Sequence, residues 1–425
     1  MADCGVENTM EKPPETSQPP DPCHRDANTQ DHRYHNGGIM AEDDQTQTTS
    51  KTRFLQLLEG LDAPGDSGNP SDPPEWLDRD LFDRGRAFYK RYLFCVFLSD
   101  LVALLAMFSV TRILQPLIYT RRSDTPFKAL RRYVSTIGRV VLWYSGDLWQ
   151  PQDPAHEDIL KVRRIHVAAA ATFNHPDRRD ALHSVTASGG KNNTDQPACP
   201  FHAPLKQDIS KQVKEEEGQA ESSVMARLEA RPGMYLSQWD MTFTQYCFMG
   251  VIMAHPWRMG AWWVTERELE GLVHFWRGCG WLLGIEDRYN FCSGTVEETR
   301  ALCLEMERQV VRPCLARSGR DTEHIGTALV DGVSSLLPWF SYPAMLRFLG
   351  DTMNLDLPSV RARMTLKHTL QYGFLRVLVH GLFLVPGVVW VFNEVLKLSL
   401  AVVQGQHPRW KAKVRVMPYS YVEYT

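Results

Sequence analysis

One helix-forming stretch decides the fold class and the candidate site: Lys161-Val162-Arg163-Arg164-Ile165-His166-Val167-Ala168-Ala169-Ala170. Its histidine is neutral near pH 7 and can therefore ligate a metal, although most histidines in such a helix are ordinary members of it. His166 follows the cluster Arg132-Tyr133-Val134-Ser135-Thr136, and 30 positions separate it from Thr136. The pairing of the cluster with the histidine suggests a metal site.

The chain as a whole has the pattern of a helical protein. From Pro74-Glu75-Trp76 onward, aromatic and aliphatic residues recur at three and four positions, as in buried amphipathic helices. Capping residues mark three helix starts: Ser237 with Asp240, Thr265 with Glu268, and Thr295 with Val296-Glu297-Glu298. Strand patterns are nearly absent apart from short stretches such as Lys413 to Tyr421. We predict an all-α fold with one multi-helix globular domain.

Composition excludes several functional classes. The 425 residues are 43% hydrophobic, enough for a substantial core, and carry a net charge of only -3. No global field therefore points to nucleic acid. Nine cysteines without C-x-x-C spacing argue against a disulfide framework and a structural zinc site, so we expect reduced thiols. Residues 1–20 lack the apolar core of a secretory signal, which predicts an intracellular protein that is not secreted.

Polar segments divide the chain. Residues 1–75, rich in Pro, Asp, Gln, Thr and Gly, predict a disordered leader, with a helix-like exception at Lys51 to Leu61. A helical domain is expected over 76–403, interrupted by a flexible polar insertion at 175–219. Residues 404–425 form a basic C-terminal tail.

Two apolar runs raise the question of a membrane. Tyr92 to Leu114 is long enough to cross a bilayer, but Asp100 near its centre favours a buried core helix. The run 377–403 is more apolar and precedes a basic cluster, so membrane contact through it is left open. Pro386-Gly387 invites a break, which makes a hairpin or an interfacial helix as compatible as a span.

Four short motifs occur in an order that is known from one family. They are Phe82-Asp83-Arg84-Gly85, Val162-Arg163-Arg164-Ile165-His166, Ser237-Gln238-Trp239-Asp240-Met241-Thr242-Phe243-Thr244-Gln245 and Gly280-Trp281-Leu282-Leu283-Gly284-Ile285. With these motifs, the chain resembles the latex-clearing-protein family, haem b rubber oxygenases grouped with the ER-bound oxygenase of mycophenolic acid biosynthesis. The resemblance covers roughly residues 80–180 and 232–350. In that family an Arg-x-x-Lys-Thr cluster precedes the iron-binding histidine at the distance that separates Thr136 from His166.

The resemblance implies a buried haem b pocket with His166 as the ligand of the iron. It implies a role in cofactor binding and catalysis for Arg132 and in catalysis for Thr136. These two residues are four apart and so share one side of a helix, from which they would direct hydrogen bonds toward bound oxygen or a haem propionate. Ser135 departs from the family, whose rubber-cleaving members carry lysine there, and a hydroxyl is a poor haem ligand. The resemblance also implies association with the endoplasmic reticulum.

Several alternatives stay open at this stage. His255 and His274 compete with His166 as ligands. Asp240 would either orient a ligand histidine or, as we expect, pair with Arg163 or Arg164 across the core. Gln238 and Thr244 would line the pocket or join helices.

The resemblance implies a haem-dependent oxygenase that uses dioxygen to cleave or oxidise an alkene of an apolar, isoprenoid- or lipid-like substrate. No specific protein partner is indicated. The alternatives are a catalytically silent, membrane-associated helical binding or scaffold protein, and an integral membrane protein whose helices imitate the pattern.

Overall fold

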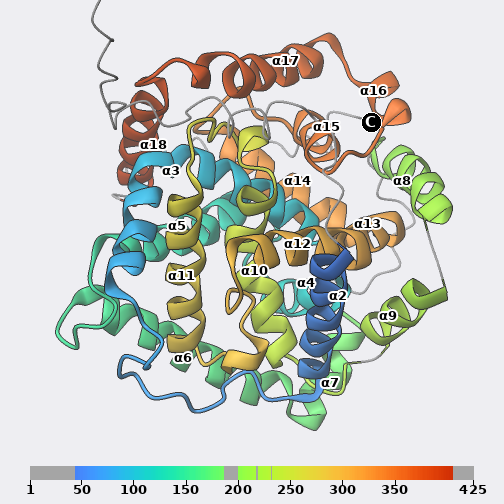
Figure 1. Ribbon diagram of the computed structural model, residues 1–425. Helices are drawn as coiled ribbons and strands as arrows, with labels where there is room; N and C mark the ends of the chain where they lie inside the picture. Colours follow the sequence, from blue (N-terminus) through green and yellow to red (C-terminus); the bar gives the residue numbers. More distant parts are fainter. Residues whose placement is uncertain (1–43, 186–199, 217–218, 231, 405–425) are drawn as a thin grey trace, which may run out of the picture. The chain divides into compact units, whose positions relative to one another are not determined.

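Helices make up the secondary structure of the part of the chain that this computed structural model describes, residues 44–185, 200–216, 219–230 and 232–404 (Figure 1). These residues form no strand, and a single isolated bridge pairs Pro64 with Ser237. The prediction of an all-α fold is therefore confirmed. The predicted strand-like stretch Lys413 to Tyr421 lies outside the described residues.

The helices follow one another with short connections. The first are α2 (Asp44–Glu59), η1 (Gly60–Asp62), α3 (Arg79–Met107), α4 (Thr111–Tyr119), α5 (Pro126–Ser145), α6 (Pro154–Phe173), α7 (Pro176–His183), α8 (His202–Glu216) and α9 (Gln219–Glu229). Then come α10 (Gln238–Ala254), η2 (Trp257–Met259), α11 (Glu266–Leu282), η3 (Asp287–Tyr289), α12 (Val296–Met306) and the π-helical turn η4 (Glu307–Val311). The last are α13 (Arg312–Arg317), α14 (Arg320–Ser334), α15 (Tyr342–Thr352), α16 (Pro358–Arg363), α17 (Leu366–His380), η5 (Leu382–Leu384) and α18 (Val388–Gln404).

The centre of the fold is α3, which packs most extensively against α11 and next against α10. Gly85 and Gly271 let α3 and α11 approach closely, because a Cβ on Gly85 would lie 2.3 Å from the carbonyl oxygen of Gly271. Aromatic rings then join a third helix to this pair. Tyr144 of α5 stacks on Tyr89 of α3 and on Phe275 of α11, with ring centroids 3.8 and 3.9 Å apart.

α3 is kinked at Tyr92, whose φ of -116° and ψ of 27° leave the helical region. The kink frees backbone groups, and Asn393 of α18 bonds them. Phe94 N donates to Asn393 Oδ1 at 2.8 Å, and Asn393 Nδ2 donates to the carbonyl oxygen of Arg91 at 2.9 Å. Asn393 thereby replaces helical hydrogen bonds lost at the kink and fixes α18 on the core.

The expectation of a disordered leader over 1–75 is wrong for its second part. Residues 44–59 form α2, which packs against α12 and α10. Phe54, Leu57 and Leu58 are buried, because their spacing of three and one places them on one face of the helix. The predicted helix-like exception at Lys51 to Leu61 thus belongs to the core, while residues 1–43 lie outside the described residues.

The expected flexible insertion at 175–219 is also corrected where the structure describes it. Residues 176–183 form α7, and residues 202–216 form α8, which packs on α13 and α16. Phe201, Leu205 and Ile209 of this segment are buried. The polar composition hid this apolar stripe, whose spacing of four residues is helical. Residues 186–199 lie outside the described residues.

The two apolar runs have different fates. Tyr92 to Leu114 is buried in the core, and Asp100 within it has no hydrogen-bond partner, so burial raises the pKa of its carboxyl well above the ordinary value. The run 377–403 is broken by residues 381–387 between α17 and α18, as Pro386-Gly387 predicts. Among the described helices none is long and apolar enough to cross a membrane alone. α3 and α4 pass that test only together, and they are bent by 96°.

Three further expectations hold. The helix starts at Ser237, Thr265 and Thr295 are capping boxes. The six cysteines within the described residues are free and buried.

Candidate functional site

His166 lies in the wall of a pocket of about 290 Å³. The pocket lies between α6, the loop that begins at Pro64 and the start of α10. Its lining residues are Pro64, Gly65, Asp66, Arg163, His166, Val167, Ala170, Ala171, Asn174, Met234, Leu236, Met241 and Leu283. Most of these side chains are apolar. The pocket is therefore an apolar space with one imidazole and one ion pair in its wall.

The sequence of α6 explains how this histidine reaches the pocket. The helix begins at Pro154 after the N-cap Asp153, whose carboxylate accepts a hydrogen bond from Ala155 N at 2.8 Å. Ile159 and His166, seven residues apart, share one face of the helix. Ile159 is fully buried and holds α6 on the core, while His166, two turns further on, meets the pocket. Ala170 and Ala171, with their small side chains, keep that space open.

The imidazole of His166 has no partner. Its Nδ1 is enclosed and forms no hydrogen bond, although the ring as a whole is partly exposed. Burial lowers the pKa of His166 to about 4 from an ordinary value of 6.5. The ring is therefore neutral at pH 7 and retains a nitrogen lone pair. Because Nδ1 is enclosed, Nε2 is the nitrogen that opens to the pocket.

The loop that closes the pocket is held by an ion pair. Arg163 donates from Nε to both carboxylate oxygens of Asp66 at 3.1 Å, and from Nη1 to the carbonyl oxygen of Asn69 at 2.7 Å. Gly65 permits the tight contact with the next segment, since a Cβ there would lie 2.1 Å from the carbonyl oxygen of Leu236. These contacts fix the mouth of the pocket on α6.

Asp240 has a structural role, but its predicted partner is wrong. Its carboxylate accepts from Arg112 Nε at 2.6 Å and from Nη2 at 3.0 Å, and both side chains are buried. Arg112 comes from α4, whereas Arg163, one of the two expected partners, pairs with Asp66. Asp240 also accepts from the backbone N–H of Ser237 at 3.0 Å, which completes the cap of α10. The pair fixes α4 against the start of α10, next to the pocket residue Met241.

Arg132 and Thr136 lie on α5 and are not among the residues that line the pocket with His166. Arg132 Nη1 donates to Thr120 Oγ1 at 3.4 Å, and Thr136 Oγ1 donates to the carbonyl oxygen of Arg132 at 3.1 Å. Burial, and next the neighbouring charge of Arg122, lower the pKa of Arg132 to about 10. These contacts are local to α4 and α5 and their connection.

The stripe that contains Arg132 and Thr136 nevertheless faces α6. Arg139, seven residues after Arg132, bonds Asp158 of α6. Because α5 and α6 form a hairpin, moving seven residues back along α5 and seven forward along α6 leads to the level of Ile165, about 10 Å along each axis. There Ile165 is 49% exposed, so α5 does not cover α6 at this level. The candidate residues thus share a level without touching.

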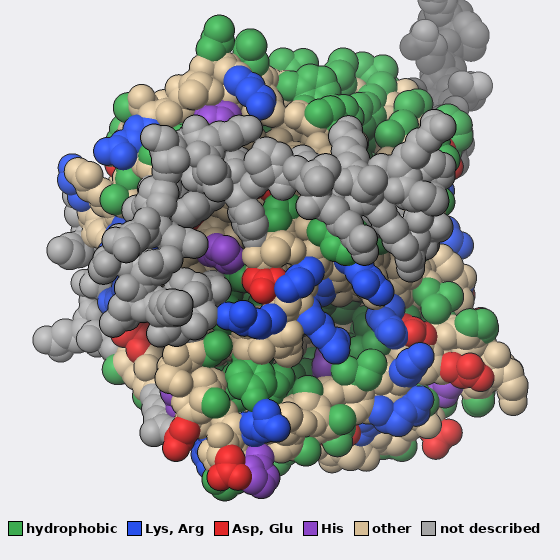
Figure 2. All heavy atoms as spheres, turned by 180° about the vertical axis from the view of Figure 1, so that it is seen from behind, with side chains coloured by type: hydrophobic (Ala, Val, Ile, Leu, Met, Phe, Trp, Pro, Cys, Tyr) green, Lys and Arg blue, Asp and Glu red, His purple; other side chains and the backbone are tan. Residues whose placement is uncertain are grey.

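Basic side chains are numerous around these helices. They are Arg121, Arg122, Lys128, Arg131, Arg132, Arg139, Lys161, Arg163 and Arg164. Figure 2 shows Lys and Arg side chains around a hollow on the rear face of the molecule.

The two competing histidines have partners elsewhere. His255 Nε2 lies 3.0 Å from both carboxylate oxygens of Glu307, in the π-helical turn η4. His274 Nε2 accepts from the backbone N–H of Asp78 at 2.9 Å. Neither lines the pocket of His166. Gln238 joins segments as the second alternative foresaw, because its Nε2 donates to the carbonyl oxygens of Pro64 and Gly284, each at 3.0 Å.

Sequence reasoning missed the loop that forms one wall of the pocket. Pro64, Gly65 and Asp66 were assigned to the disordered leader. Pro-Gly-Asp is a turn signal, and a turn between two apolar segments would have placed this loop inside the domain. Met234 and Met241, which supply flexible apolar surface to the opposite wall, carried no signal that separated them from core methionines.

Comparisons with known proteins were made for the whole chain. No protein-family model matches it, and no curated protein does. Among solved structures, a latex clearing protein in its closed state is similar, with a TM-score of 0.47 and 18% sequence identity. The alignment covers 84% of this chain and 88% of that chain.

The residues of the pocket fit the axial side of a haem better than its full volume. Within the described ranges, no three His, Cys, Asp or Glu side chains could hold a metal ion among themselves. Iron held by a porphyrin needs only axial side chains, and His166 offers a neutral imidazole between apolar walls. A pocket of about 290 Å³ lies at the lower end of the range of roughly 300–1,000 Å³ for ligand sites. The macrocycle must then extend beyond this pocket.

Proposed function

We propose that this protein is a haem b-dependent oxygenase that cleaves or oxidises an alkene of an apolar, isoprenoid- or lipid-like substrate with dioxygen. The observation that carries the proposal is the unpartnered, neutral imidazole of His166 in an apolar pocket. Enclosed polar groups in proteins nearly always have a hydrogen-bond partner, so an imidazole without one is a candidate for a ligand. The order of the sequence motifs around His166 supports the same cofactor.

In this proposal Nε2 of His166 is the axial donor, and haem supplies the oxygen chemistry when bound. The low pKa of His166 keeps the donor unprotonated throughout the neutral range. An axial histidine usually donates its Nδ1–H to a carbonyl or carboxylate, which makes the imidazole more basic. Nδ1 of His166 lacks that hydrogen bond. We therefore expect a weaker iron–histidine bond than in sites that have one.

The chain's own residues would orient the ligands and exclude water. Met234, Leu236 and Met241 form an apolar wall that suits an alkene and keeps water away from the reacting carbon atoms. The exposed apolar side chain of Ile165 offers a surface along which the macrocycle extends from the pocket toward α5. Arg132 and Thr136 would then meet its edge, as the register of α5 and α6 allows.

The experiment is a haemin titration of the purified full-length protein. We expect a Soret band that saturates at one haem per chain and is lost in His166→Ala. The matched control is His175→Ala, because His175 is exposed at the start of α7 and should leave the band unchanged. A protein that stays colourless, or a band that persists in His166→Ala with unaltered position, contradicts the cofactor assignment.

Activity is tested separately on the haem-loaded protein. Short isoprenoid alkenes are incubated with dioxygen, and carbonyl products are trapped with a hydrazine reagent. We expect products with the wild type and His175→Ala and none with His166→Ala. A second function, a catalytically silent binding protein, is favoured by Ser135 at the position of the family's lysine. It predicts haem or alkene binding without oxygen uptake.

A further inference from the structure

The outer side of α17 carries an apolar stripe that nothing described in the chain covers. Leu366, Leu370 and Val377 are 60 to 76% exposed, far more than is usual for such side chains. Their spacing of four and seven residues places them on one face of the helix. The opposite face is anchored, since Leu375, Leu378 and Val379 are fully buried. The stripe is therefore the free side of a docked helix.

α18 continues the same feature. Trp390, Val395 and Leu398 are 43 to 68% exposed, while Leu396 and Asn393 on the other side are buried. The segment between the helices, residues 382–385, also exposes three of its four apolar side chains. We call the surface defined by Leu366, Leu370, Val377, Trp390, Val395 and Leu398 the outer apolar face.

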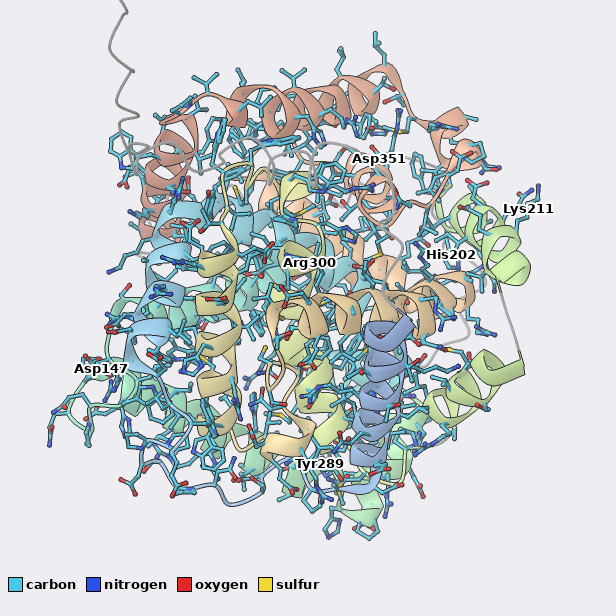
Figure 3. All side chains as sticks on the ribbon, in the orientation of Figure 1. Asp147, His202, Lys211, Tyr289, Arg300 and Asp351 are labelled. Atoms are coloured by element: carbon cyan, nitrogen blue, oxygen red, sulfur yellow. The ribbon has the colours of Figure 1, made fainter. Side chains whose placement is uncertain are left out.

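The outer apolar face is rigidly held. Trp262 Nε1 donates to the carbonyl oxygen of Val379 at 2.6 Å, and Asn393 bonds the backbone of α3. On the inner side of α17, Asp351 accepts hydrogen bonds from Tyr372 and from Arg376, where Figure 3 labels Asp351 beneath the helix. Figure 2 shows hydrophobic side chains along the upper edge, where Figure 1 places α17. Exposure is thus a property of a fixed surface.

The charge of this part of the chain differs in sign from the whole. The full chain has a net charge of -3, but residues 358–425 contain nine Lys and Arg against two Glu. Five of the nine, among them Lys367 and Lys397, lie on or beside α17 and α18, and four follow in residues 409–415. Apolar side chains beside basic ones are typical of helices that lie in the interface of an anionic membrane.

We propose that the outer apolar face docks on the surface of a lipid bilayer that contains anionic lipids, with α17 and α18 lying in the plane of the interface. Neither helix is long and apolar enough to cross. A second copy of the chain would bring the same basic residues against each other, which like-charge repulsion opposes. A bilayer instead accepts the apolar side chains and pairs the basic ones with lipid phosphates and carboxylates.

This surface is separate from the pocket of His166. Figure 1 places α17 at the top of the helical unit and α6 with α7 at the bottom. Docking therefore does not depend on haem or on His166, and the two proposals fail independently. His166→Ala should bind vesicles as the wild type does.

The test is flotation of the full-length protein with vesicles of phosphatidylcholine, alone or mixed with phosphatidylserine. We expect flotation with the mixed vesicles, weaker at high salt, and a partition constant reduced at least roughly tenfold in the double variant Leu370→Gln/Leu398→Gln. The control is Leu55→Gln/Leu304→Gln, which changes two exposed leucines on α2 and α12 and should float normally. Circular dichroism checks that both variants are folded.

A second measurement reports contact directly. Lipids brominated in their acyl chains should quench the fluorescence of the wild type more than that of Trp390→Phe. The proposal is overturned if the protein does not float, if both double variants float equally well, or if Trp390→Phe is quenched as much as the wild type. It is also overturned if light scattering shows a lipid-free dimer that Leu370→Gln/Leu398→Gln abolishes, because the occupant is then a second copy.

Discussion

Asp240 and His166 are two enclosed polar groups at the same end of the fold, and they differ in one respect. The carboxylate of Asp240 is bonded by Arg112 and by the backbone of Ser237. The enclosed Nδ1 of His166 is bonded by nothing. A polar group whose partners are complete holds the scaffold together, whereas one without a partner reduces stability and is retained for another reason. The contrast separates structure from candidate function better than the sequence motif, which contains both residues.

The largest effect should follow from breaking the satisfied group. Asp240→Ala leaves the guanidinium of Arg112 buried and unpaired, so we expect the free energy of unfolding to fall by about 3–5 kcal/mol. Urea denaturation followed by circular dichroism measures it. The control is Glu286→Ala, which removes an exposed ion pair with Arg288 and should cost less than about 1 kcal/mol. Equal losses in the two variants would show that the buried pair is not special.

Arg112→Lys should cost less, roughly 1–3 kcal/mol. It keeps the charge but loses the planar fork that bonds both oxygens of Asp240 at 2.6 and 3.0 Å. The same urea titration measures the loss. A variant as stable as the wild type would mean that charge alone, without the paired geometry, holds α4 on α10.

The unsatisfied group should show itself through pH. The folded pKa of His166 is about 4 against an ordinary 6.5, so the unfolded chain takes up the proton first. Stability is then full above pH 6.5 and falls as the pH decreases toward 4. Because the ring is partly exposed, we expect a loss on the order of 1–2 kcal/mol beyond that of His166→Leu over this range, without added haem. Parallel pH profiles for the two proteins would contradict the low pKa.

The smallest effect is expected at pH 7. His166→Leu replaces an enclosed polar ring by an apolar side chain of similar size, so stability should change by less than about 1 kcal/mol in either direction. Thermal unfolding without haem measures it. A loss comparable to that of Asp240→Ala would reveal a hydrogen bond to the imidazole and would assign His166 to the scaffold.

Local signals in the sequence predicted more of this molecule than long-range ones did. The caps at Ser237, Thr265 and Thr295 need only residues three apart, and all three are present. The partner of Asp240 could not be predicted, because Arg112 is 128 positions away and the choice between arginines depends on how α4 crosses α10. The central place of α3 was within reach, since Asp100 argued for burial rather than a span.

The candidate site shows the same limit. The spacing from Thr136 to His166 selected two helices that do face each other, but it carried no information on the loop at Pro64. Composition misled at α2 and α8, where a polar sequence hides a narrow apolar stripe that packs only because another helix meets it. Such stripes become visible in the tertiary arrangement.

The six buried thiols have a consequence for handling an enzyme that would use dioxygen. Burial raises the pKa of Cys95, Cys279 and Cys303 above the ordinary value for a thiol, so almost no thiolate exists in the native state. Oxidants and alkylating reagents attack the thiolate, and these sulfur atoms are also out of their reach. The rate at which these cysteines become labelled therefore counts how often the core opens, and a stored sample that has begun to unfold would announce it by mass spectrometry before any turbidity develops.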